Sequence, residues 1–188
     1  SLNVGKPYEF ERIWKSIDPK KHGKLFLTYG GEGSIRDEIL NVFTENDKCA
    51  FEHYVAIWNF TKSKVEYIPF HNITHEQTKQ YIKGAIAMPL LSKGEIINGD
   101  RYLDGAFIDN IPAYPLLDKD LDYILCVYFD NHKYFFETAD FDKKIIKFFD
   151  FPNQRRLETL GFNPSRFDEM VQYGYDYALN TLRELFKN

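Results

Sequence analysis

Cysteine is scarce in this sequence, and long apolar runs are absent. The 188 residues include only Cys49 and Cys126, too few for the disulfide framework of a small secreted domain. Cys126 lies within an apolar run, where a buried free thiol is expected. No stretch approaches the roughly 20 apolar residues of a membrane span, and no basic-then-apolar leader opens the chain. These absences favour a soluble, cytoplasmic protein.

Positive charge is not in excess either. The sequence has 24 Lys and Arg against 28 Asp and Glu, for a net charge of −4. Because this balance supplies no broad positive field for phosphates, we predict no nucleic-acid partner. The chain has no tracts rich in Gly/Ser or Pro, and 44% of it is hydrophobic, too much for intrinsic disorder. We therefore expect a single folded domain over residues 1–188.

Helical and extended patterns alternate along the chain. The spacing of apolar side chains predicts an amphipathic helix at 8–17. Further helices are expected at 34–43, from a capping box at Thr74 and Gln77 to Met88, near 141–149, and after Asn163 and Pro164, the last with a buried apolar stripe. Strands are expected at 24–29, at 51–61 and 64–70 as a hairpin, and at 123–130. The apolar run at 123–130 is typical of a strand buried on both faces in a parallel sheet, so the fold class is α/β.

The segment 101–112 is the most informative for chemistry. Asp104 follows an apolar lead-in and precedes Gly105, and a second turn signal, Asp-Asn-x-Pro, begins at Asp109. Gly105 permits a positive φ and has no Cβ, so another group could approach the Asp104 carboxylate closely. A carboxylate held in such a turn can orient or deprotonate a hydroxyl nucleophile. From these residues alone, two ordinary turns are the simpler interpretation.

A wider set of motifs resembles the patatin-like phospholipases. The set comprises a small-residue helix end before a proline (85–89), Tyr-Leu-Asp-Gly-Ala (102–106), Asn110-x-Pro112, the apolar strand at 123–130 and Gly174-Tyr175-x-x-Ala178. The resemblance is strong over 51–130 and weaker at both ends. One departure is Ala85, where many members of the family carry serine.

The resemblance implies a three-layer α/β/α sandwich and a Ser–Asp catalytic dyad without histidine. Asp104 would be the base of the dyad, Gly105 and Ala106 would complete its motif, and Asn110 and Pro112 would support it structurally. A phospholipid or another lipid ester would be the substrate, and neither a metal nor an organic cofactor is implied. An aspartate, with a pKa near ~4 in water, needs a desolvated site to act as a base.

The nucleophile of such a dyad is missing from these residues. The family places its serine in a G-x-S-x-G elbow, which occurs nowhere in 1–188. The chain begins at Ser1 and resembles the last two-thirds of a patatin-like domain, without its N-terminal strands. We therefore expect the serine to lie upstream, and the chain alone to be inactive because an Asp without its Ser cannot form an acyl-enzyme.

Other interpretations remain open at this point. The chain could be a non-catalytic module that binds lipid or protein through an exposed apolar face, with homo-oligomers or peripheral membrane contact as consequences. The glycines at 30–33 fit a plain turn better than a phosphate loop, since no Lys-Ser/Thr follows. His71 and His75 have metal-ligand spacing but flank a helix cap and have no third ligand close in sequence.

Overall fold

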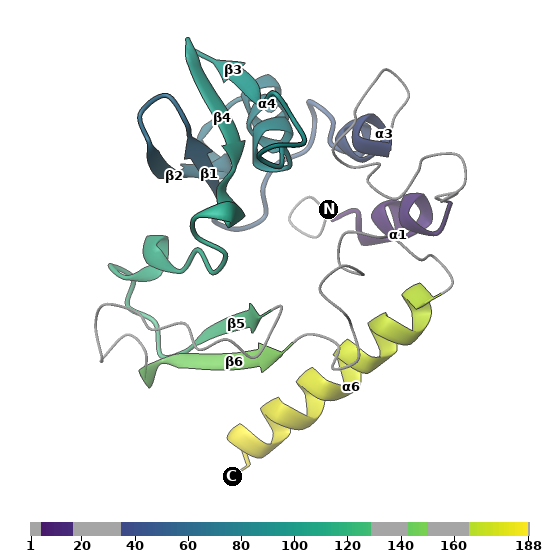
Figure 1. Cartoon of the computed structure of the whole chain (residues 1–188). Helices are drawn as coiled ribbons and strands as arrows, with labels where there is room; N and C mark the ends of the chain where they lie inside the picture. The colour runs from purple at the N-terminus through teal and green to yellow at the C-terminus, as the bar shows by residue number, and fades with distance from the viewer. Residues whose placement is uncertain (1–4, 17–34, 129–142, 150–165, 188) are drawn as a thin grey trace. The chain divides into compact units, whose positions relative to one another are not determined.

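The computed structural model describes residues 5–16, 35–128, 143–149 and 166–187 (Figure 1). The strand predicted at 24–29, the glycine turn, the cap at Ser34 and the helix start at Asn163 and Pro164 lie outside these residues. The chain forms two compact units, Ser1–Pro115 and Leu116–Asn188, each with its own elements. Helices and strands occur together, so the molecule is mixed α/β, as the alternating patterns predicted.

The first unit is built on a four-stranded sheet with the order β2-β1-β4-β3 (Figure 1). The strands are β1 (Tyr54–Asn59), β2 (Lys64–Pro69), β3 (Glu95–Ile97) and β4 (Asp100–Asp104). The predicted hairpin is confirmed by the antiparallel pairing of β1 with β2. The pairs β1–β4 and β3–β4 are antiparallel too. The parallel pairing that the sequence predicted for the strand at 123–130 is found in the second unit.

A two-residue turn connects β3 to β4. Asn98 and Gly99 both have positive φ, 52° and 86°, and Ile97 pairs with Asp100 across the turn. Asn-Gly is the preferred sequence for this geometry because both residues tolerate left-handed backbone. After the turn, β4 runs antiparallel to β3 and ends at Asp104.

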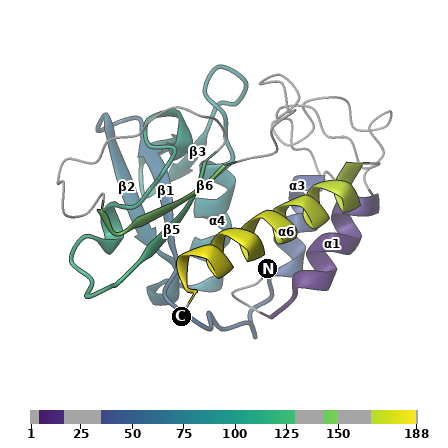
Figure 2. The same ribbon diagram turned by 90° about the horizontal axis from the view of Figure 1, so that it is seen from below.

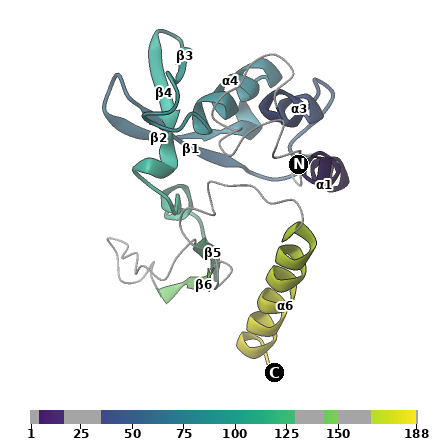
Figure 3. The ribbon, with the colours of Figure 1, turned by 45° about the vertical axis from the view of Figure 1, so that its right-hand side comes forward.

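One face of the sheet is covered by α4 (His75–Ala85) (Figures 2 and 3). The predicted capping box is confirmed: the Gln77 N–H donates to Thr74 Oγ1 at 3.2 Å, and the Thr74 N–H donates to Gln77 Oε1 at 3.0 Å. The helix ends at Ala85, before the predicted Met88, because Ile86 already leaves helical backbone geometry. Under the helix lies an apolar core of Ile57, Ile97 and Tyr102, against which Ile68, Tyr81 and Ala85 pack.

Two shorter α-helices also belong to the described part of this unit. They are α1 (Pro7–Ser16) and α3 (Ile35–Val42), which confirm the helices expected there. Lys6 fastens the end of α3: its Nζ donates to the Val42 carbonyl at 3.0 Å and pairs with Asp47 at 2.7 Å. The hydrogen bond from Lys6 holds the pKa of Asp47 below its usual value.

The second unit contains a parallel pair of strands, β5 (Ile124–Tyr128) and β6 (Ile145–Phe149), and the helix α6 (Phe167–Leu185). The strand predicted at 123–130 is confirmed, but Leu125 and Val127 are more than half exposed, so its burial on both faces is wrong. The short helix expected near 141–149 is also wrong, because 145–149 forms β6. Its isoleucines and phenylalanines are residues that strands favour.

The long C-terminal helix exists, but its apolar stripe is not buried. No residue of α6 is buried, and Val171 and Leu185 are exposed. Among the described residues, no helix combines the length and apolarity needed to cross a membrane.

Candidate active site around Asp104

Asp104 is the last residue of β4, at the edge of the core. Its backbone pairs with Ile57 of β1, and its N–H donates to the Ala87 carbonyl at 2.9 Å. The two residues before it, Tyr102 and Leu103, are buried, whereas Asp104 itself is half-buried. The strand therefore delivers the carboxylate to the boundary between the apolar interior and the surface.

One carboxylate oxygen of Asp104 is fixed and the other is available. Oδ1 accepts a hydrogen bond from the Ala106 N–H at 2.9 Å, which caps the short 3-10 helix η3 (Gly105–Phe107). Within the described part of the chain, Oδ2 has no hydrogen-bond partner. Burial raises the pKa of Asp104, an effect that outweighs the opposing hydrogen bond from Ala106. A poorly solvated carboxylate with one free oxygen is a stronger proton acceptor than an exposed one.

Gly105 is required by the strand beside it. A Cβ built on Gly105 would lie 2.5 Å from the carbonyl carbon and oxygen of Ala56 and 2.6 Å from the Ile57 nitrogen. The sequence permitted a positive φ at this glycine and a close approach of another group to the Asp104 carboxylate. The structure shows instead that the backbone of β1 lies close to Gly105 itself, and its φ is not positive. Gly105 thus seats the Asp104 turn directly on the neighbouring strand.

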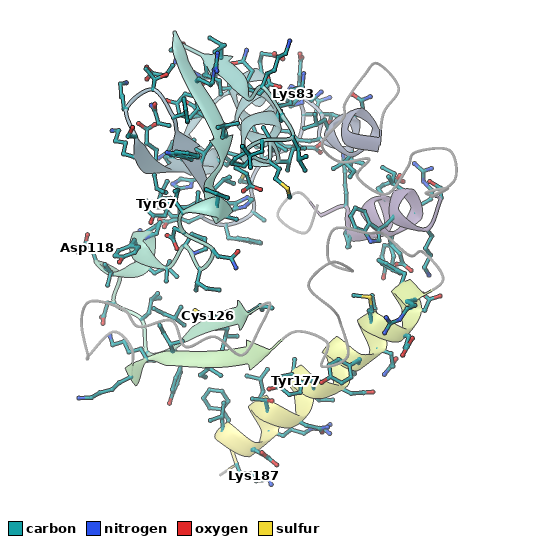
Figure 4. All side chains as sticks on the ribbon, in the orientation of Figure 1. Tyr67, Lys83, Asp118, Cys126, Tyr177 and Lys187 are labelled. Carbon is teal, nitrogen blue, oxygen red and sulfur yellow. The ribbon has the colours of Figure 1, made fainter. Side chains whose placement is uncertain are left out.

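The residues after η3 form a second turn that is tied to the first. Asp109 donates its N–H to the Gly105 carbonyl at 2.9 Å, and its Oδ1 accepts from the Ile111 N–H at 3.2 Å. Its Oδ2 accepts a hydrogen bond from the Tyr67 hydroxyl of β2 (Figure 4 labels Tyr67). Asn110 is half-buried and Pro112 is exposed, and both follow Asp109 closely in the chain.

The hydrogen bond between Tyr67 and Asp109 supports the candidate site, and it could not be predicted from the sequence. The two residues are 42 positions apart, and nothing in the local pattern of β2 distinguishes Tyr67 from other strand tyrosines. Burial, together with the hydrogen bond to Asp109, raises the pKa of Tyr67 well above its ordinary value, so its hydroxyl remains a donor. It anchors the turn that follows the Asp104 motif.

Replacing Tyr67 by phenylalanine should therefore loosen this turn. We expect Tyr67→Phe to lower the free energy of unfolding by about 1–2 kcal/mol, because a half-buried carboxylate oxygen loses its donor. Tyr54→Phe is the matched control, since the Tyr54 hydroxyl donates to exposed Glu52 at 3.3 Å and should matter little. Urea unfolding of both variants measures the difference, and equal stabilities would contradict the anchoring role.

A second polar cluster surrounds Asn59, two residues after Ile57 in β1. Its hydrogen bonds and ion pairs connect neighbouring strands. Asn59 is fully buried, and its Nδ2 donates to Glu66, Asp100 and the Tyr102 hydroxyl at 3.1, 3.0 and 3.2 Å. Lys62 pairs with Asp100, and Lys64 pairs with Glu66 at 3.1 Å. Burial opposes ionisation of Glu66, but hydrogen bonds from Lys64, Tyr102 and Asn59 together hold its pKa below the usual value. Every acid here already has a cation, which leaves none free for chemistry.

His71 and His75 each contact a different backbone group. His71 Nδ1 accepts from the His53 N–H at 3.3 Å, and His75 Nε2 lies 2.8 Å from the Phe43 carbonyl oxygen. Both rings therefore hold separate parts of the backbone. In the part of the chain that the structure describes, no three His, Cys, Asp or Glu side chains are grouped to hold a metal ion.

Apolar side chains are exposed immediately after Asp104. Phe107 and Ile108 are 63% and 56% exposed, and the Phe107 ring stacks on Trp58 with centroids 5.9 Å apart. Trp58 also meets Phe60, which is 47% exposed.

Comparison with protein-family models finds no match to this chain, and comparison with curated protein sequences finds none either.

Proposed function

We propose that this chain is the later part of a patatin-like serine acyl hydrolase that cleaves phospholipid or other lipid esters. Asp104 is the base of a Ser–Asp dyad, and its serine lies upstream of Ser1. The observation that carries the proposal is the Asp104 carboxylate: half-buried, raised in pKa, and held at Oδ1 by the Ala106 N–H. The fuller fold that we propose is the three-layer α/β/α sandwich of that family.

Each feature of the turn has a role in this reaction. The free Oδ2 takes the proton of the serine hydroxyl as the serine oxygen attacks the ester carbonyl carbon. The leaving alcohol takes that proton as its C–O bond breaks, and water then hydrolyses the acyl-enzyme. Gly105 and the Tyr67–Asp109 contact hold the base in place. Exposed Phe107 and Ile108 supply apolar contact for an acyl chain.

The alternative is a non-catalytic module that binds lipid or protein. The exposed apolar side chains of Phe60, Phe107 and Ile108 favour it, since exposed apolar groups often mark an interaction surface. Hydrolysis of a short-chain nitrophenyl ester by the chain extended upstream separates the two. Activity that Asp104→Asn removes supports the hydrolase, and the absence of activity in the extended protein leaves the binding module.

A further inference from the structure

Leu90 is exposed to an unusual degree in the loop that joins α4 to β3. Its side chain is 98% exposed, and its φ is +71°. This loop also supports the candidate site, since the Ala87 carbonyl three residues earlier accepts the Asp104 N–H. An exposed leucine therefore projects from the segment that holds Asp104 in register.

Neither the backbone nor the solvent favours leucine at this position. A positive φ costs a residue with a Cβ about 1–2 kcal/mol, which glycine would avoid. The other non-glycine residues with positive φ in the described ranges are Ser63 and Asn98, both polar residues in hairpin turns. Leucine at 90 makes no contribution to the core, so folding does not explain its presence.

The loop holds this side chain outward in a fixed turn. The Leu91 and Ser92 N–H groups both donate to the Met88 carbonyl, at 3.2 and 3.0 Å. The Ser92 hydroxyl oxygen then accepts from the Gly94 N–H at 3.1 Å. Lys93, three residues after Leu90, is exposed. An apolar tip is thus followed by a cation on a hydrogen-bonded loop.

We propose that Leu90 is an anchor that inserts into a lipid surface and brings the Asp104 site to it. This inference rests on the proposed function, because a lipid ester substrate resides in such a surface. One leucine at the tip of a turn suits shallow insertion among acyl chains, and the flexible stem of Lys93 lets its ammonium reach headgroup phosphates. The strained and exposed side chain thereby gains the apolar surroundings that the fold denies it.

Vesicle binding by the 188-residue chain tests this anchor without requiring turnover. We expect the chain to co-sediment with phosphatidylcholine vesicles, more strongly when phosphatidylglycerol is included. Leu90→Asn should reduce the partition coefficient about five- to tenfold, because the apolar side chain is lost. Asparagine tolerates positive φ, so thermal stability should not fall. Leu117→Asn, which removes another exposed leucine, is the control and should bind as the parent chain does.

Three results would overturn the anchor. They are no binding by the parent chain, equal binding by Leu90→Asn, and a loss of self-association in Leu90→Asn without any change in vesicle binding. The last result would make a second copy of the chain the partner. Failure of the proposed function is distinct, since it is read from hydrolysis of a soluble ester in the absence of vesicles.

Discussion

If the proposed function is right, Asp104→Asn is expected to abolish ester hydrolysis by a protein that carries this chain together with the proposed upstream serine. The amide cannot accept the proton of the serine hydroxyl, so kcat should fall about 10³-fold or more. KM should change little, since the substitution preserves the size of the side chain. Hydrolysis of a short-chain nitrophenyl ester measures both constants, and Asp118→Asn, at an exposed aspartate in the second unit, is the control.

The fold should survive this substitution, and that distinguishes a functional residue from a structural one. Burial raises the pKa of folded Asp104, so the folded state binds its proton more tightly than the unfolded state. The stability that this group contributes is therefore greatest below its unfolded pKa and declines as pH rises through its folded pKa. At neutral pH, Asp104→Asn removes a desolvated charge and keeps an oxygen for the Ala106 N–H. We expect unfolding stability equal to the parent's or higher.

The raised pKa of Asp104 also determines how hydrolysis depends on pH. The proposed dyad needs the ionised carboxylate, so kcat/KM should fall with decreasing pH, with a midpoint above the ordinary aspartate value of 3.8. If Asp104→Asn keeps more than about a tenth of the parent activity, Asp104 is not the base. Loss of activity accompanied by unfolding would instead make Asp104 structural.

Local signals predicted the elements near Asp104 well. The Thr74–Gln77 capping box and the β1–β2 hairpin depend on neighbouring residues, and both are confirmed. The Asn98-Gly99 turn was equally readable from sequence, as Asn-Gly is a strong signal for a two-residue hairpin. It would have predicted β3 and β4, and with them the strand that ends at Asp104.

The errors arose where the outcome depends on distant parts of the chain. The apolar content of residues 145–149 is compatible with either a helix or a strand. These residues form a strand because they pair with β5. The exposure of Leu125 depends on what covers β5, which its own sequence does not specify. Likewise, the Tyr67–Asp109 contact joins β2 to a turn 42 residues later, and the Asn59 network joins three strands. Tertiary pairing brings these groups together, and no local spacing encodes it.

Gly105→Ala is expected to destabilise the first unit strongly, because the added methyl group meets only backbone atoms. The added Cβ would overlap the Ala56 carbonyl and the Ile57 nitrogen, which are backbone atoms of β1 and cannot rotate away. Alanine tolerates the φ of Gly105, so the whole effect comes from this overlap. We expect a loss of about 2–4 kcal/mol in unfolding free energy, as for overpacked cores. Trp14 and Trp58 both lie in the first unit, so tryptophan fluorescence during urea unfolding reports on it.

Ala106→Ser is the matched control, because it also adds one heavy atom, one residue further along the same turn. Ala106 is exposed, so its stability should stay within about 0.5 kcal/mol of the parent. Gly84→Ala should be intermediate, since its Cβ would meet the movable end of the Ile57 side chain at 2.7 Å. The order Gly105, Gly84, Ala106 therefore follows from what each added atom meets. If Gly105→Ala proved as stable as Ala106→Ser, the turn would not be seated on β1, and the position of the Asp104 carboxylate would lose its structural basis.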